Sequence, residues 1–133
     1  MYIRFVTDLI DRKSKQKLGV IRAAAYCKSN NQFTEDDNER LDELFGWFND
    51  FLLVPYSFSE QNKSNAISWF KDRSEICIRK VRSICEILEK YGYSVEMLVS
   101  NNPGYIVYED ENQVTAIPFD DNDSFQFADL SLQ

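Results

Sequence analysis

Residues 94–117, which decide the fold class, read SVEMLVSNNPGYIVYEDENQVTAI. Three short runs rich in β-branched and aromatic residues, at 94–99, 105–108 and 113–117, predict three strands. The NNPG and DEN segments between them contain turn-forming residues, so the chain is expected to reverse direction after each of the first two strands. The simplest arrangement of these elements is an antiparallel β-meander made of two consecutive hairpins.

The sequence before this segment supplies at least one further strand. Residues 2–7 (YIRFVT) are apolar and β-rich, which predicts an N-terminal strand that joins the same sheet. Residues 11–17 are polar and charged and predict a loop. Residues 66–70 (AISWF) fit either a buried strand or the start of a helix.

Apolar residues at helical spacing predict three helices. The first covers residues 18–28, where three consecutive alanines raise helix propensity. The second begins after Thr34, because threonine caps helix N-termini and three acidic residues follow it. The third is capped by Asp72 or Ser74 and ends before Gly92. Its apolar residues cover more than one face, which predicts that it is the central helix of the core.

Together these elements predict an α+β domain over residues 1–119. We expect three helices packed on one face of a small, mainly antiparallel sheet, which combines the N-terminal strand with the C-terminal β-meander. A chain of 133 residues can bury a core of this kind without disulfide or metal staples. Residues 120–133 are predicted to form an acidic C-terminal tail or a further edge strand.

The net charge of −7 is concentrated at one end of the chain. No lysine or arginine follows Lys90, whereas the segment from Tyr91 to Gln133 contains eight acids. These acids are Glu96, Glu109, Asp110, Glu111, Asp120, Asp121, Asp123 and Asp129. Residues 1–90 hold the other 14 of the 22 acids and all 15 bases, so they are almost neutral.

An acidic surface repels phosphate backbones, so we expect no direct nucleic-acid binding through the C-terminal third. Three interpretations of the acidity remain open, namely solubility, a bound cation and a basic protein partner. The chain has no signal-peptide pattern and no apolar run near the roughly 20 residues of a membrane span. We therefore expect a cytoplasmic protein with no membrane contact.

The residues that the chain lacks disfavour several kinds of chemistry. There is no histidine, which removes Ser-His-Asp and Cys-His catalysis and most zinc sites. The four glycines form no phosphate-binding motif, and no cofactor is expected. Cys27, Cys77 and Cys85 form no C-x-x-C pair and are predicted to be free, buried thiols.

Two carboxylate clusters are the remaining candidates for a functional site. Glu109, Asp110 and Glu111 lie at a strand end beside a turn, where oxygen ligands could hold a divalent cation. The run at 120–123 (DDND) departs from the EF-hand pattern, since serine or phenylalanine stands where the loop glycine belongs. Solvated turn acids and partner contacts are the alternatives to a metal site. We assign no catalytic and no metal-binding residue.

The run from Gly104 to Asp110 (GYIVYED), followed by Gln113-Val114, Ala116 and Pro118-Phe119, also carries a resemblance. It resembles the end of a group of small uncharacterised bacterial proteins with the pattern G-x-I-V-Y-E-D-x-x-Q-V-x-A-x-P. Proteins of this group also tend to carry segments like three others in this chain, YIRFVT at 2–7, WFN at 47–49 and SWFK at 68–71. The resemblance implies a stand-alone bacterial or phage protein, and it transfers no catalytic residue.

The interpretation that fits these observations best is a non-enzymatic interaction module that meets a basic protein through its acidic third. Immunity proteins and inhibitors of nucleic-acid enzymes are concrete versions of such a module. The candidate partner-binding residues are Glu109, Asp110, Glu111, Asp120, Asp121 and Asp123. A small enzyme that uses Glu109, Asp110 and a divalent metal is one alternative. A homo-oligomer that pairs through an exposed strand edge is another.

Overall fold

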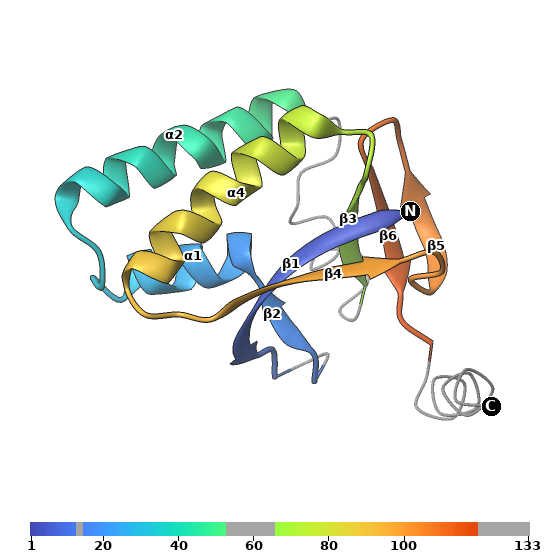
Figure 1. Ribbon diagram of the computed structural model, residues 1–133, viewed down its shortest axis with the longest axis horizontal. Helices are drawn as coiled ribbons and strands as arrows, with labels where there is room; N and C mark the ends of the chain where they lie inside the picture. The colour runs from blue at the N-terminus through green and yellow to red at the C-terminus, as the bar shows by residue number, and fades with distance from the viewer. Residues whose placement is uncertain (13–14, 53–65, 120–133) are drawn as a thin grey trace.

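The computed structural model describes residues 1–12, 15–52 and 66–119 (Figure 1). Within these ranges the chain has an α+β fold, which confirms the predicted class. Figure 1 shows the helices gathered on one side of the sheet. The described helices are α1 (Val20–Ser29), α2 (Glu35–Phe51) and α4 (Glu75–Lys90). The described strands are β1 (Tyr2–Ile10), β2 (Lys17–Gly19), β3 (Ile67–Lys71), β4 (Val95–Ser100), β5 (Tyr105–Glu109) and β6 (Gln113–Ile117).

The sheet is built around β1, which pairs with three other strands. In the described chain the strand order is β2-β1-β3-β6-β5, and β4 pairs with the opposite edge of β1. All of these pairs are antiparallel. Residues 66–70 therefore contribute a strand, not a helix start, and β3 connects β1 to the β5–β6 hairpin. β1 is longer than predicted, and β2 forms inside a segment that predicts a loop and a helix start.

The predicted C-terminal β-meander is wrong in one respect. β5 and β6 form the expected hairpin, but β4 pairs with β1 from Thr7↔Val95 to Tyr2↔Ser100. The NNPG segment therefore does not close a hairpin, and it connects one outer strand of the sheet to another. Turn residues report a change of chain direction, whereas the pairing partner depends on contacts far away in the sequence.

The main core lies between the helices and the sheet. It combines buried apolar side chains of all three described helices with Phe5 of β1, and Phe70 of β3 packs against it. α4 contributes six buried residues, more than α1 or α2, which confirms that it is the central helix. Cys27, Cys77 and Cys85 are free and buried, as predicted. Burial raises the pKa of the Cys85 thiol to about 12, so this cysteine stays protonated.

Two of the predicted helix-end signals act as expected, whereas Ser74 precedes α4 without a side-chain capping bond. The Thr34 hydroxyl accepts a hydrogen bond from the Asp37 N–H at 3.3 Å and so caps α2. Gly92, with φ of +91°, follows α4. The Gly92 N–H donates to the Glu89 carbonyl at 3.0 Å, and the Tyr93 N–H donates to the Leu88 carbonyl at 3.1 Å. These two bonds form the Schellman motif that ends many helices.

The start of α2 is also tied to the end of α4. Asp37 is buried, and its Oδ2 accepts hydrogen bonds from the Tyr91 hydroxyl at 2.5 Å and from Lys90 Nζ at 2.9 Å. The bond from Tyr91, followed by that from Lys90, lowers the pKa of the Asp37 carboxyl. Lys90, the last basic residue of the sequence, therefore forms an ion pair that links α4 to α2.

Candidate functional site

The turn between β5 and β6 contains the first predicted acidic cluster, and Asp110 organises it. Asp110 Oδ1 accepts hydrogen bonds from the N–H groups of Asn112 at 2.8 Å and Gln113 at 3.0 Å. Its Oδ2 accepts one from the Tyr108 hydroxyl at 2.8 Å. Burial raises the pKa of this carboxyl, but the hydrogen bonds outweigh burial and leave the pKa below its ordinary value. Both oxygens are thus engaged inside the turn, where Asp110 forms an Asx-type turn.

Replacing Asp110 by alanine is expected to lower the free energy of unfolding by about 2 kcal/mol at pH 7, the scale of a lost charged hydrogen bond. Because the folded pKa is depressed, this contribution is present above the unfolded pKa of about 3.9. It is lost as the pH falls through the folded value. Urea unfolding of both proteins across a pH series checks this. Glu111→Ala is the matched control, expected within about 0.5 kcal/mol of the parent. A variant as stable as the parent at pH 7 would refute the structural role of Asp110.

Glu109, the last residue of β5, is paired with a lysine. Its Oε2 lies 2.7 Å from Lys71 Nζ, and the lysine side chain is only 13% exposed against 45% for the glutamate. The Lys71 N–H donates to the Asn112 carbonyl at 2.8 Å. An open polar depression of about 280 Å³ lies beside this ion pair. It is lined by Met1, Tyr2, Lys71, Asp72, Arg73 and Glu109.

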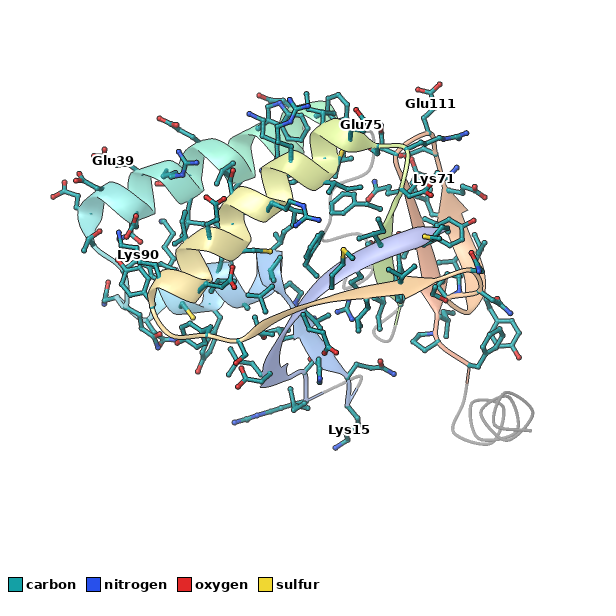
Figure 2. The ribbon with its side chains drawn as sticks, in the orientation of Figure 1. Lys15, Glu39, Lys71, Glu75, Lys90 and Glu111 are labelled. Atoms are coloured by element: carbon teal, nitrogen blue, oxygen red, sulfur yellow. The ribbon has the colours of Figure 1, made fainter. Side chains whose placement is uncertain are left out.

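The same turn is fastened to the start of α4, because Ser74 Oγ and Asn112 Oδ1 lie 2.9 Å apart in a hydrogen bond. Glu111 at the turn and Glu75 in the first turn of α4 are both exposed. Figure 2 shows them at the same end of the molecule, close to Lys71. The turn therefore presents exposed carboxylates from a fixed backbone, a form of preorganisation that favours binding.

β5 is an outer strand of the sheet. β6 pairs with one of its edges, and no described strand pairs with the other. A bulge between Ile106 and Tyr108 interrupts the ladder to β6. Three successive side chains up to and including the bulge are exposed, namely Tyr105 at 55%, Ile106 at 48% and Val107 at 39%. Sheets usually protect an edge of this kind, because its backbone groups are a template for another strand.

The three remaining predicted contact residues, Asp120, Asp121 and Asp123, lie outside the described residues. The structure thus brings Glu109, Asp110 and Glu111 together in one turn and leaves the second cluster unplaced. Over the described ranges, no group of three or more Cys, Asp or Glu side chains is arranged to hold a metal ion. None of the helices described has the length and apolar character needed to cross a membrane.

A cavity of about 90 Å³ lies elsewhere, where β2 and β3 diverge along the same edge of β1. Arg4, Arg22 and Trp69 are among the residues that line it. The one feature of the sequence that hints at this cavity is Arg4, a charged residue inside the apolar run YIRFV. The cavity itself depends on three strands that are distant in the chain, so local patterns do not predict it.

Compared with known proteins, the chain matches no protein-family model, no curated sequence and no solved structure.

Proposed function

We propose that this chain is a non-enzymatic interaction module that binds a basic protein partner by strand addition along the outer edge of β5. The observation that carries the proposal is this edge, along which no strand of the described residues pairs, together with the exposed side chains of Ile106 and Val107. Strand addition supplies affinity through backbone hydrogen bonds and specificity through side chains on alternate faces.

Charge favours a basic partner over a second copy of the chain. Residues 91–119 contain four acids and no base, and the whole chain carries −7. Pairing two copies along β5 would bring two acidic C-terminal regions together, and the repulsion between copies of equal negative charge opposes this. A basic strand would meet the exposed acids of the turn and gain electrostatic steering. Direct binding of nucleic acid through this face is disfavoured for the same reason.

β4 is the other long outer strand, with Met97 and Val99 each 48% exposed, but its surroundings suit a basic partner less well. Lys17 Nζ lies 2.8 Å from Glu96, and Arg82 Nη2 lies 3.9 Å from the Met97 sulfur. Glu96 of β4 is therefore balanced by Lys17 and Arg82 adds a positive charge, whereas Glu111 beside β5 is an exposed carboxylate.

The metal-enzyme alternative finds no support in the turn. Its ligands would be Glu109, which is paired with Lys71, and Asp110, whose oxygens accept hydrogen bonds from the turn. In our proposal the protein works in the reducing cytoplasm of a bacterial or phage-infected cell, as an immunity or inhibitor protein. Its three free cysteines support a reducing compartment.

Replacing Ile106 by lysine is expected to abolish partner capture, because a lysine on an edge strand opposes pairing. Glu111→Lys is expected to weaken capture and to reduce its salt dependence. The measurement compares tagged variants in lysate of the source organism, with the retained basic protein quantified at low and high salt. Glu39→Lys is the charge-matched control, because Figure 2 shows Glu39 at the opposite end of the molecule from Glu111.

Equal retention of the partner by Ile106→Lys and the parent would contradict the proposal. So would a dimeric mass of the parent in light scattering that Ile106→Lys converts to a monomer, because the occupant of the edge would then be a second copy.

A further inference from the structure

We propose that the cavity beside β1 binds a small organic anion whose negatively charged oxygens are bound by Arg4 and whose apolar or aromatic body lies against Trp69. The site is independent of the β5 edge. The cavity is basic although the protein has a net charge of −7. We therefore expect a negatively charged ligand here, in contrast to the basic protein partner proposed for β5.

The cavity exists because β1 changes partners along one edge. Ile3 is opposite Phe70 of β3, and Val6 is opposite Gly19 of β2. Arg4 and Phe5 lie between these two ladders and have no described strand partner on that edge. The cavity lies in the space between β2 and β3 where these two strands diverge.

The walls of the cavity are apolar, with a few charged groups among them. Phe5, Trp69 and Phe70 are among the apolar lining residues. Arg4, Arg22 and Asp11 also line the cavity, so its charged side chains carry a net charge of +1. Arg22 Nη1 lies 3.4 Å from Asp11 Oδ2. An apolar pocket with a few convergent polar groups is the usual form of a small-molecule site.

Arg4 is the group that points to an anion. Its Nη2 donates to the Lys17 carbonyl at 3.2 Å, a neutral acceptor for one of its five N–H donors. Burial, followed by repulsion from Arg22, lowers the pKa of Arg4 to about 10, and Asp11 only partly offsets this. The guanidinium is still charged at neutral pH, and none of the ion pairs within the described residues involves Arg4. A bound anion would balance this charge.

The size of the cavity and the glycine at position 19 are both compatible with such a ligand. One buried water needs about 10–15 Å³, so a cavity of about 90 Å³ has room for a group of several atoms. A Cβ at Gly19 would lie 3.3 Å from Arg4 Nη2, so glycine at this position leaves space for the guanidinium. Carboxylate and phosphate groups both match the planar fork of an arginine.

The test titrates the ¹⁵N-labelled protein with benzoate, phenyl phosphate, inorganic phosphate and benzamidine, and follows the Gly19 amide and the Trp69 indole N–H. We expect benzoate or phenyl phosphate to shift both signals with saturation. Benzamidine, which has the shape of benzoate and the opposite charge, should shift neither. The tighter of the two aromatic anions identifies the preferred head group, and inorganic phosphate should bind at least about tenfold more weakly than phenyl phosphate.

Arg4→Met should weaken binding of the aromatic anion about tenfold or more. Arg79→Met, which removes an exposed arginine of α4, should leave binding unchanged. If Arg4→Met does not fold, the shift map of the parent decides the test. The proposal is overturned by unchanged signals at millimolar benzoate and phenyl phosphate, by equal shifts with benzamidine, or by equal affinity of phenyl phosphate and inorganic phosphate.

Discussion

Replacing Gly104 by alanine is expected to lower the free energy of unfolding by about 3 kcal/mol or more. Gly104 has a φ of +140°, which L-residues rarely adopt. An added Cβ would lie 2.1 Å from the Ile117 carbonyl oxygen, 2.7 Å from its carbonyl carbon and 3.0 Å from Pro118 Cα. All three atoms belong to the backbone, so no side-chain rotation relieves the overlap. The start of β5 would have to move away from the end of β6, which would also disturb the proposed binding edge.

Two other glycines provide controls for Gly104→Ala. Gly92 has a φ of +91° but nothing within 4 Å of an added Cβ, so alanine there is expected to cost about 1 kcal/mol from backbone strain alone. Gly46 lies inside α2 with similar free space, so alanine should stabilise the protein by about 0.5–1 kcal/mol. Urea unfolding of the three variants ranks them. A Gly104→Ala protein no less stable than Gly92→Ala would show that the close approach to Ile117 is not required.

Replacing Phe48 by alanine is expected to cost about 3–5 kcal/mol, the range for a large aromatic removed from a core. Phe48 in α2 is fully buried. Its ring lies 5.8 Å from the Phe70 ring of β3 and 5.0 Å from the Trp47 ring. The side chain therefore joins the helices to the sheet, and its removal would leave a cavity at that junction.

Phe51, one turn further along the same helix, is the matched control for Phe48. It is 39% exposed and stacks on Trp47 at 4.6 Å, so alanine there is expected to cost about 1 kcal/mol. Thermal and urea unfolding compare the two variants. Equal losses of stability for Phe48→Ala and Phe51→Ala would contradict the position of the core between α2 and β3.

Sequence reasoning succeeds here where a structural feature has a local cause. Thr34 caps α2 and Gly92 ends α4, because capping depends on a few neighbouring backbone groups. β6 occupies the residues predicted for it, since strand propensity changes sharply at both of its ends. Local patterns do not predict β2, because three residues are too few to show a period.

Features that depend on contacts between residues far apart in the chain cannot be predicted from local sequence patterns. The strand run at 94–99 predicts a strand, but nothing in it specifies that β4 pairs with β1. The acidic cluster at 109–111 is visible in the sequence, yet its three members differ in role. Asp110 holds the turn, Glu109 pairs with Lys71, and Glu111 is exposed. The cavity at Arg4 has the longest-range origin, because β2 and β3 must both meet β1 to form it.

The claim that β5 is the binding edge is tested most directly by amide hydrogen exchange, measured on the protein alone and with its captured partner. Strand addition would protect amides within residues 105–109, since their outward backbone groups would gain hydrogen-bond partners. We expect this protection in β5, with exchange along α2 unchanged. Unchanged exchange in β5, together with new protection on another surface, would contradict the account.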